Sequence, residues 1–538
     1  MNNRRAKGQF YTPTLFVDHA HKMIAEQFGE DWKEKYVVWD NCCGTKNLTR
    51  DYSFNELYCS TLEEAELHIS ERYNREATAF QFDFLNDSLD KLPQGLKDAL
   101  ENNKPIIFLI NPPYADAGSG FGSAKKEGTT KTMINEEMVA NKIGLASRNL
   151  YAQFLYRITE IKNQFNLTDV HICLFSPTLL LAGSSWKGFR NYFLNQFAFS
   201  NAVQFKASHF ADVADSWGIS FSIWNNGETA DKNNFNYTLI DNIDGEIKEV
   251  GDKIVYNLDN ALSAGDWFRK ELKLDKTEKV LFPHLSNAIK VSEIENQALL
   301  PNSIGSVSFH SNNVDKNTQG VAIFSSIQTQ GTAYISNSIT NDNFDKCTAL
   351  FSARKLIEKN WVNSKDEYLA PNTESDKYQE FVNDSIVYSL FHSASNQSSL
   401  RQVEYKGKNW DIKNEFFFMS KDEVMELANE NNLDFTYNDA RVSNERYVYT
   451  KLQTIELSQE AKAVLDKAIE LTKMSFKYRE LFNEEHPEYQ ILNWDCGWYQ
   501  IKGMLKEYFP NKLKEFNELY KALANKMRPM VYELGFLK

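Results

Sequence analysis

The first 230 residues of the sequence predict an α/β fold, a Rossmann-like sheet with helices on both faces. Apolar runs rich in β-branched residues alternate with helical stretches over the first 110 residues, which is typical of βαβ units and a parallel sheet. The unbroken apolar run at 106–110 predicts a strand buried on both faces. It stops at a double proline, which cannot continue a central strand. Asn111 and Tyr114 are therefore expected at the carboxyl end of that strand, where open α/β sheets bind their ligands.

The bulk composition predicts a soluble globular protein of about two to four domains. Of the 538 residues, 42% are hydrophobic and 25% are charged, and no apolar run approaches the ~20 residues that cross a bilayer. The first residues predict no signal peptide, and six cysteines without a disulfide-like framework fit a reducing cytoplasm. No Cys/His spacing predicts a metal site. The net charge of −13 argues against a generally basic nucleic-acid binder but is compatible with a local basic groove.

The elements before 110 each end in residues suited to a ligand. A helical pattern runs over 15–28, with Thr14 as its expected N-cap. Residues 36–39 predict the first strand, which runs into an acid and a glycine turn, the pattern by which α/β folds place a nucleoside-bearing ligand. The second strand, at 57–60, is followed by Glu63 and Glu64, either of which would accept hydrogen bonds from ribose hydroxyls. The third, at 79–82, leads to Asp83 and Phe84, which suit an adenine amine and an adenine ring.

Further along, the pattern predicts a long mobile loop at 115–132 and a helix at 149–161. A buried strand at 170–175, a helix at about 186–197 and two strands at 202–205 and 219–224, expected as an antiparallel edge, complete the first domain. His171 and His209 lie in or beside apolar runs and are expected to be structural. We expect domain 1–230, a connector at 231–280, a β-rich or mixed domain at 281–419 and a helical region at 420–538.

The segment Asn111-Pro112-Pro113-Tyr114 suits chemistry at a flat amine. The exocyclic amine of adenine is a weak nucleophile until acceptors bind both of its hydrogens. The side-chain oxygen of Asn111 can be one acceptor, and the carbonyl of Pro112, held extended by the rigid Pro-Pro step, can be the other. Tyr114 offers a face on which a base can stack. An acyl amide such as a glutamine side chain would fit equally well, and four residues alone also suit an ordinary turn.

The order of these pieces resembles a known family. Gly-Gln-Phe-Tyr-Thr-Pro at 8–13, Asp-Asn-Cys-Cys-Gly-Thr-Lys-Asn-Leu at 40–48, then Asp83-Phe84 and then Asn-Pro-Pro-Tyr resemble the S-adenosylmethionine-dependent adenine-N6 DNA methyltransferases of the NPPY type. The closest pattern is the group whose catalytic domain precedes its target recognition domain. The resemblance covers roughly the first 230 residues. It implies a Rossmann-like methyltransferase sheet there, with 281–419 as the target recognition domain.

The resemblance also implies roles for individual residues. The donor, S-adenosyl-L-methionine, would lie with its amino-acid end against Phe10, Tyr11, Thr12 and Pro13, above the loop with Asp40, Gly44 and Thr45. Its adenine would lie at Asp83 and Phe84. The family's acid after the second strand has no clearly aligned counterpart here, so Glu63 at the ribose rests on its place after that strand. Asn111, Pro112, Pro113 and Tyr114 would hold the target base, and Phe210 would pack against it once flipped. The implied partner is double-stranded DNA. The implied setting is the cytoplasm of a bacterium or phage-infected cell, in restriction-modification, phage defence or anti-restriction, with the chain acting as a monomer or as a subunit of such a system.

Two positions depart from the family pattern. The family's usual proline after the first acid is Asn41, and its second loop glycine is Lys46. A lysine takes positive φ less readily than a glycine and adds charge near a sulfonium. Three alternatives stay open. An RNA adenine methyltransferase would use the same residues, and a protein glutamine methyltransferase also uses Asn-Pro-Pro-Tyr, although it would not need the additional second half of the chain. Lys46 and the acidic net charge favour the third, a catalytically silent nucleic-acid-binding relative. A cytosine-N4 enzyme would usually carry serine in place of Asn111.

Overall fold

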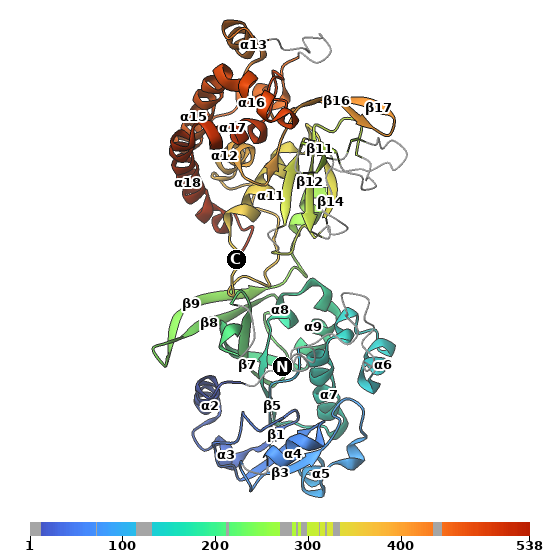
Figure 1. Ribbon diagram of the computed structural model, residues 1–538. Coiled ribbons are helices and arrows are strands. Elements are labelled where there is room, and N and C mark those ends of the chain that lie inside the picture. Colours follow the sequence, from blue (N-terminus) through green and yellow to red (C-terminus); the bar gives the residue numbers. More distant parts are fainter. Residues whose placement is uncertain are drawn as a thin grey trace. The chain divides into compact units, whose positions relative to one another are not determined.

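The computed structural model describes residues 12–70, 73–114, 132–210, 215–269, 282–283, 285–286, 289–291, 299–310, 313–317, 320–325, 334–433 and 444–538. Phe10, Tyr11 and nearly all of the expected loop at 115–132 lie outside these residues. The chain forms two compact units (Figure 1). The first contains 1–261, 359–367 and Lys538, and the second contains 262–358 and 368–537. No helix among the described residues is long and apolar enough to cross a membrane.

The first unit is built on one nine-stranded sheet with the order β3-β2-β1-β4-β5-β7-β6-β8-β9. Neighbouring strands are parallel from β3 to β5, whereas β7 is antiparallel to both β5 and β6. The strands are β1 (Val37–Asp40), β2 (Glu56–Thr61), β3 (Thr78–Gln81), β4 (Ile106–Ile110), β5 (Val170–Ser176), β6 (Phe197–Lys206), β7 (Gly218–Asn226), β8 (Asn234–Ile243) and β9 (Glu246–Tyr256). The expected α/β class is confirmed. Strands β6 and β7 are antiparallel as expected, but they are not the edge of the sheet, because β8 and β9 lie beyond β6.

Helices cover both faces of this sheet, which explains why β4 is apolar throughout (Figure 1). Ile106, Phe108 and Ile110 contact one core with helices α5, α6, α7 and α9, and Ile107 and Leu109 contact a second core with α2 and α3. The helices of the unit are α2 (Thr14–Phe28), α3 (Trp32–Lys35), α4 (Glu64–Ser70), α5 (Gln94–Glu101), α6 (Met133–Ala140), α7 (Leu150–Phe165), α8 (Leu179–Ala182) and α9 (Lys187–Leu194), with the short turns η1 (Leu89–Lys91), η2 (Leu145–Arg148), η3 (Ser184–Trp186) and η4 (Ala207–His209).

Two boundaries differ from the expected ones. Helix α2 begins at Thr14 with Pro13 as its N-cap, so the N-cap expected at Thr14 is wrong by one residue: Thr14 already has helical geometry. The expected connector at 231–280 begins with the hairpin β8–β9, which continues the sheet through the pairing of Val203 and Gln204 with Thr238 and Leu239. The first compact unit therefore runs beyond residue 230, to residue 261.

A short segment from the second half of the chain, 359–367, completes the first unit. Within this returning segment, the carboxylate of Asp366 lies 2.6 Å from the Lys253 ammonium of β9, and both side chains are almost fully buried. Gln204 of β6 donates to the carbonyl of Trp361 (2.8 Å), and Tyr256 donates to the carbonyl of Glu367 (2.8 Å). The returning segment thus satisfies three polar side chains on two strands, β6 and β9.

The second unit joins a four-stranded sheet, of order β14-β12-β13-β15, and a set of helices around one hydrophobic core. The expected mainly helical region after 420 is confirmed. Its strands are β10 (Leu285–Ser286), β11 (Lys290–Val291), β12 (Gly305–His310), β13 (Val321–Phe324), β14 (Tyr334–Ile339), β15 (Ser395–Asn396), β16 (Leu400–Tyr405) and β17 (Lys408–Ile412). Its helices are α10 (Ala264–Arg269), α11 (Phe344–Leu356), α12 (Tyr378–Phe391), α13 (Lys421–Glu430), α14 (Tyr447–Leu452), α15 (Gln459–Ser475), α16 (Arg479–Glu485), α17 (Trp498–Tyr508) and α18 (Pro510–Glu533), with η6 (Phe476–Tyr478) and η7 (Pro487–Tyr489).

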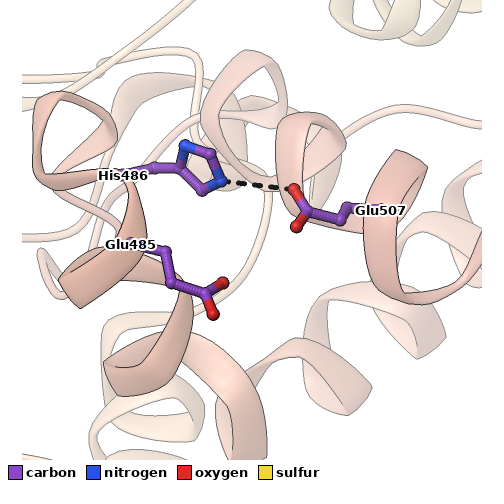
Figure 2. A group of neighbouring side chains, drawn as sticks. All are labelled: Glu485, His486 and Glu507. Atoms are coloured by element: carbon purple, nitrogen blue, oxygen red, sulfur yellow. Dashed lines mark ion pairs between the residues drawn. The ribbon is translucent and has the colours of Figure 1, made fainter.

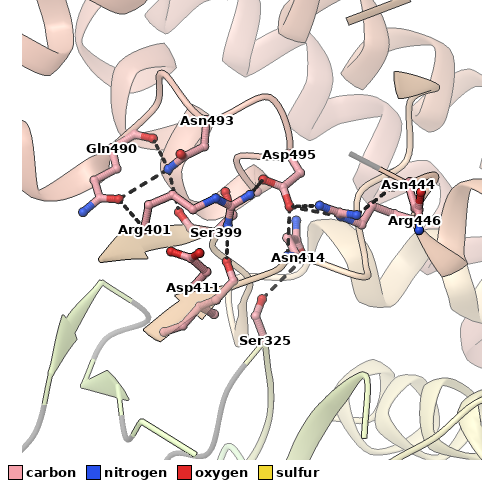
Figure 3. Close-up of polar contacts among 12 residues, drawn as sticks. Ser325, Ser399, Arg401, Asp411, Asn414, Asn444, Arg446, Gln490, Asn493 and Asp495 are labelled. Atoms are coloured by element: carbon pink, nitrogen blue, oxygen red, sulfur yellow. Dashed lines mark hydrogen bonds and ion pairs between the residues drawn. The ribbon is translucent and has the colours of Figure 1, made fainter. Parts of the chain in front are cut away.

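A buried charge network links distant parts of this second unit (Figure 3). Asp495 accepts hydrogen bonds from Arg401 (2.9 Å) and Arg446 (2.7 Å), and all three side chains are almost fully buried. The Arg446 guanidinium also lies 4.2 Å from the ring centre of Trp494, which is itself buried. Because buried charges need partners, this network ties the hairpin β16–β17 and the segment before α14 to the stretch before α17.

Candidate functional site

The candidate site lies where the chain changes direction across the sheet. From β1 the chain goes to β2 and β3 on one side and then to β4 and β5 on the other, so β1 and β4 flank the topological switch point. Asp40 ends β1, and Asn111 follows the last residue of β4. Since the two strands are parallel neighbours, both residues lie at the same edge of the sheet. The backbone of Asn111 forms a hydrogen bond with the thiol of Cys42, which lowers the pKa of that thiol. Burial has the larger effect and raises the pKa of Cys42 well above its ordinary value.

The side-chain amide of Asn111 is held at both ends. Its Nδ2 donates to Oγ1 of Thr12 at 2.9 Å, and its Oδ1 accepts from the hydroxyl of Tyr114 at 2.5 Å. Thr12 is 2% exposed, and its own carbonyl accepts from Nδ2 of Asn47 at 3.3 Å. These bonds fix the orientation of the amide. An amide oxygen has two lone pairs, so Oδ1 is of the type that accepts up to two hydrogen bonds.

The ring of Tyr114 is held by other aromatic side chains. It meets the ring of Tyr151 edge-on at 6.3 Å, and Tyr151 stacks on Trp186 at 4.7 Å. The Tyr151 hydroxyl accepts from the backbone N–H of Leu180 at 2.9 Å. Burial raises the pKa of Tyr114 well above its ordinary value, so its hydroxyl stays protonated and can donate to Asn111. Pro112 is buried and Pro113 is half-buried between these two residues.

Asp40 is a buried acid with one oxygen unmatched. The side chain is 1% exposed, and Oδ1 accepts from the backbone N–H of Cys42 at 3.4 Å. Oδ2 has no hydrogen-bond partner in the described part of the chain. Burial raises the pKa of Asp40 to about 8, against the opposing charge of Lys46. A buried carboxyl group with an unmatched oxygen is a place for a cation or a hydrogen-bond donor.

The loop after Asp40 takes the shape that glycines favour, although one of its residues is a lysine. Gly44 has φ 49° and Lys46 has φ 58°, both left-handed. The Lys46 ammonium, 1% exposed, donates to the carbonyls of Tyr73 (3.2 Å) and Asn74 (3.3 Å). These two carbonyls stabilise the buried ammonium, and the same hydrogen bonds fix the loop to residues 73 and 74. Thr45, half-buried, donates to Oδ1 of Asn47 at 2.8 Å.

The next two strands bring acids to the same edge. Glu63, half-buried, follows β2, whereas Glu64 is exposed and begins α4. Asp83 follows β3, and its carboxylate accepts from the backbone N–H of Leu85 (3.0 Å) and from Nδ2 of Asn86 (2.8 Å). These bonds close a local turn and leave lone pairs on the carboxylate for another donor.

Two predicted aromatic contacts are packed in the interior. Phe84 is 3% exposed and stacks on Phe154 at 5.1 Å. Phe210 is 1% exposed, and its ring lies parallel to that of Phe205 at 6.0 Å. The roles expected for Phe84 and Phe210 against a donor or a base stay predictions. The structure brings Thr12, Asp40, Asn111 and Tyr114 together, and it places Phe84 and Phe210 in the two cores.

One residue of the site was not expected from the sequence. Asn41 is 1% exposed, and neither its Oδ1 nor its Nδ2 has a hydrogen-bond partner among the residues described. Its position directly after the acid that ends β1 is a signal in the sequence, where it stands in place of the family's proline. Its burial depends on packing that no local pattern reveals.

Another cluster of ionisable residues lies in the second unit (Figure 2). Glu485, His486 and Glu507 each bring one ligand atom to within 4.8 Å of the others. His486 and Glu507 form an ion pair at 3.3 Å, and both glutamates are exposed. The hydroxyl of Tyr508 donates to Glu485 at 2.6 Å. These contacts describe a surface ion-pair cluster.

Comparison with known proteins found similarity only among solved structures. No family model and no curated protein matches the chain. A type I restriction-modification methyltransferase subunit from Streptococcus thermophilus matches with 14% identity and a TM-score of 0.31 over 45% of this chain and 50% of that one. The EcoKI M protein of a type I restriction enzyme matches with 11% identity and a TM-score of 0.28 over 43% and 48%. The type IIG restriction endonuclease BpuSI matches with 13% identity and a TM-score of 0.32 over 52% and 36%. The matches cover half or less of the length of these proteins.

Proposed function

We propose that this protein is an S-adenosylmethionine-dependent methyltransferase that methylates N6 of an adenine flipped out of double-stranded DNA. The observation that carries this proposal is the fixed amide of Asn111. It follows a fully buried strand, its orientation is set by Thr12 and Tyr114, and it lies at the same sheet edge as the unmatched acid Asp40. A strand end that presents an oriented acceptor beside a place for a cation suits the transfer of a methyl group from a sulfonium to an amine.

The residues present fit the donor. Oδ2 of Asp40, buried and unmatched, would accept from the donor's ammonium, and the left-handed Gly44 lets the backbone approach it closely. Glu63 and Asp83 end the next two strands, where the ribose and the adenine of the donor would extend along the edge. When bound, S-adenosylmethionine supplies an electrophilic methyl group. Phe10, Tyr11, Thr12, Pro13, Thr45 and Phe84 remain proposed neighbours of the donor.

The residues after β4 would prepare the amine. A flipped adenine, extruded at a cost of a few kcal/mol, would stack on Tyr114 and donate to Oδ1 of Asn111 and to the carbonyl of Pro112. The bonds from Thr12 and Tyr114 hold Oδ1 in place before the base arrives, so little reorganisation is needed. No general base has to act first, because the amine proton becomes acidic only as the nitrogen gains positive charge. Pro113 keeps the segment rigid.

The second unit supplies the remaining parts of the proposal. We propose that 281–419 recognises the target sequence and that the helical region from 420 supports it. The net charge of −13 is compatible with contacts to DNA phosphates confined to a local surface. We further propose a role in restriction-modification, phage defence or anti-restriction, either as a monomer or as a subunit of such a system in the cytoplasm of a bacterium or an infected cell.

Methyl transfer from isotope-labelled S-adenosylmethionine tests this function. Unmethylated DNA, RNA and protein are offered in turn, and we expect label in DNA at N6 of adenine. Asn111→Ala should lower the rate by about 100-fold or more, because it removes the preorganised acceptor. Tyr114→Phe should cause a smaller loss, since it keeps the ring and removes only the hydroxyl that orients Asn111. Asn102→Ala, at the exposed end of α5, is the matched control and should leave the rate unchanged.

The outcomes of this assay separate the alternatives. Label in DNA that survives Asn111→Ala would contradict the role given to that residue. Label in RNA or in glutamine residues of protein would move the substrate to another class. A wild-type protein that does not bind S-adenosylmethionine by calorimetry would favour a nucleic-acid-binding relative without activity. A methylation map of a host genome that expresses the chain would then give the recognition sequence.

A further inference from the structure

Asn41, directly after the end of β1, is a buried residue whose side-chain polar atoms are unpaired among the described residues. Its side chain is 1% exposed, yet neither its oxygen nor its nitrogen has a hydrogen-bond partner in the described part of the chain. The adjoining acid, Asp40, has its Oδ2 unmatched as well. Buried polar groups are nearly always hydrogen-bonded, because leaving them unpaired costs free energy. Three unmatched polar atoms on two successive residues indicate a ligand that completes their hydrogen bonds.

The surroundings of Asn41 limit what this ligand can be. Lys46, a basic residue of the same loop, donates its ammonium to the carbonyls of Tyr73 and Asn74. The side-chain nitrogen of Asn47 donates to the carbonyl of Thr12. Both groups are therefore engaged in holding the loop and its neighbours. Nδ2 of Asn41 is the donor that remains unmatched at this position, and Oδ1 of Asn41 and Oδ2 of Asp40 are the unmatched acceptors.

One donor and two acceptors match the amino-acid end of the methyl donor. An α-ammonium group needs acceptors, preferably one with a negative charge, and an α-carboxylate needs a hydrogen-bond donor. The proline that the family usually carries at this position has no side-chain polar atom and could make neither contact. An asparagine here would therefore add a pair of hydrogen bonds that a proline cannot make.

We infer that Asn41 is a positioning residue for the amino-acid end of S-adenosylmethionine. Its Oδ1 accepts from the α-ammonium beside Asp40, and its Nδ2 donates to the α-carboxylate. This inference rests on the proposed function, because it assumes the same donor. It goes further in assigning the recognition of the amino-acid end to a residue outside the family pattern.

Calorimetry on the full chain with three ligands tests the inference. S-adenosylmethionine and S-adenosylhomocysteine carry the amino-acid end, and 5′-methylthioadenosine lacks it. Asn41→Leu keeps the number and branching of the side-chain heavy atoms and removes both polar atoms. It should weaken binding of the first two ligands about 10- to 100-fold, because hydrogen bonds to charged groups are lost. It should change the affinity for methylthioadenosine by less than about two-fold. Asn102→Leu on the exposed end of α5 is the control and should leave all three affinities unchanged.

A second readout separates ligand binding from a structural role. Without ligand, Asn41→Leu should melt at or above the temperature of the wild type, because it removes two unpaired buried polar atoms. A structural asparagine would instead lower the melting temperature when replaced. If the leucine variant does not fold, Asn41→Asp serves in its place. It keeps the volume and loses the donor, so it should weaken S-adenosylmethionine more than its decarboxylated analogue.

Each outcome supports or overturns the inference. Unchanged affinity for S-adenosylmethionine in Asn41→Leu, or equal losses for all three ligands, would overturn the assignment to the amino-acid end. A lowered melting temperature with unchanged binding would make Asn41 structural. If the wild type bound none of the three ligands, the proposed function itself would fail, and that result is distinct from a failure confined to the variant.

Discussion

His21 couples helix α2 to the loop beneath the candidate site. Its ring is 4% exposed, stacks on Tyr52 at 3.6 Å and places Nε2 2.9 Å from the carbonyl of Leu48. Since a carbonyl only accepts, Nε2 carries the proton in this bond. Burial lowers the pKa of His21 to about 4, so the ring is neutral in the folded protein at neutral pH.

This histidine predicts a loss of stability in acid. Between pH 6.5 and about 4 the unfolded chain binds a proton at His21 and the folded chain does not, so the free energy of unfolding falls as the pH falls. At about 1.4 kcal/mol per pKa unit, the full effect is roughly 3 kcal/mol. His21→Gln keeps an N–H donor for Leu48 and removes the titration. Urea unfolding of both proteins at pH 7, 5.5 and 4.5 should show a weaker pH dependence in the variant. An equal dependence of the unfolding free energy on pH in both proteins would contradict the lowered pKa of His21.

At the same scale, the local role of a residue was easier to predict than its partners. Asn111 and Tyr114 could be placed at a strand end because an apolar run and a double proline are local signals. The bond from Asn111 to Thr12 spans 99 positions, and no pattern within one element reveals it. Lys46 illustrates the same limit. Its positive φ follows from its place in the loop, but the carbonyls that hold its ammonium come from residues 73 and 74.

Among the elements, those buried on both faces were predicted best. Strand β4 is a continuous apolar run, and β5 is apolar apart from His171 and Ser176, which fits their central places in the sheet. Strand β9 is mostly exposed and rich in charged residues, so the sequence around it suggested a connector. The returning segment, 359–367, lies about a hundred residues beyond β9 in the chain. Its contribution to the first unit depends on contacts that are visible only in three dimensions.

The buried pair between β9 and the returning segment gives a test at this scale. Lys253→Met leaves the carboxylate of Asp366 buried without its ammonium, which should cost about 3–5 kcal/mol of the free energy of unfolding. The double variant Lys253→Met/Asp366→Leu should recover most of that loss, because no charge remains buried. Lys248→Met is the control on the same strand. Its ion pair with Glu246 is exposed and 4.0 Å long, so little change is expected.

Urea unfolding of the wild type and the three variants shows whether the charge of Lys253 or the packing of its side chain stabilises the first unit. A single variant as stable as the wild type would show that Asp366 needs no partner in the folded state. A double variant as unstable as the single one would indicate that packing of the lysine chain, and not its charge, holds the returning segment.

At the scale of the whole molecule, the chain leaves the first unit and returns to it, so this unit is discontinuous in sequence. The residues of the candidate site nevertheless all precede residue 115. A chain that ends at residue 261 keeps Thr12, Asp40, Asn41, Asn111 and Tyr114 but loses the returning segment. Without that segment, Lys253 loses its ion pair, and Gln204 and Tyr256 lose the carbonyls to which they donate. Buried polar groups left in this way destabilise a fold even when its core is intact.

We therefore expect a chain of residues 1–261 to melt well below one in which a Gly/Ser linker joins 359–367 to residue 261. A difference of about 3–5 kcal/mol corresponds to roughly 10 °C for a unit of this size. The linked chain with Asp366→Leu should melt between these two chains, because it restores the carbonyls for Gln204 and Tyr256 but leaves Lys253 unpaired. Thermal melts followed by circular dichroism measure this, and calorimetry with S-adenosylmethionine shows whether the linked unit keeps the donor site. Equal melting temperatures for the first two chains would mean that the first unit is complete without its returning segment.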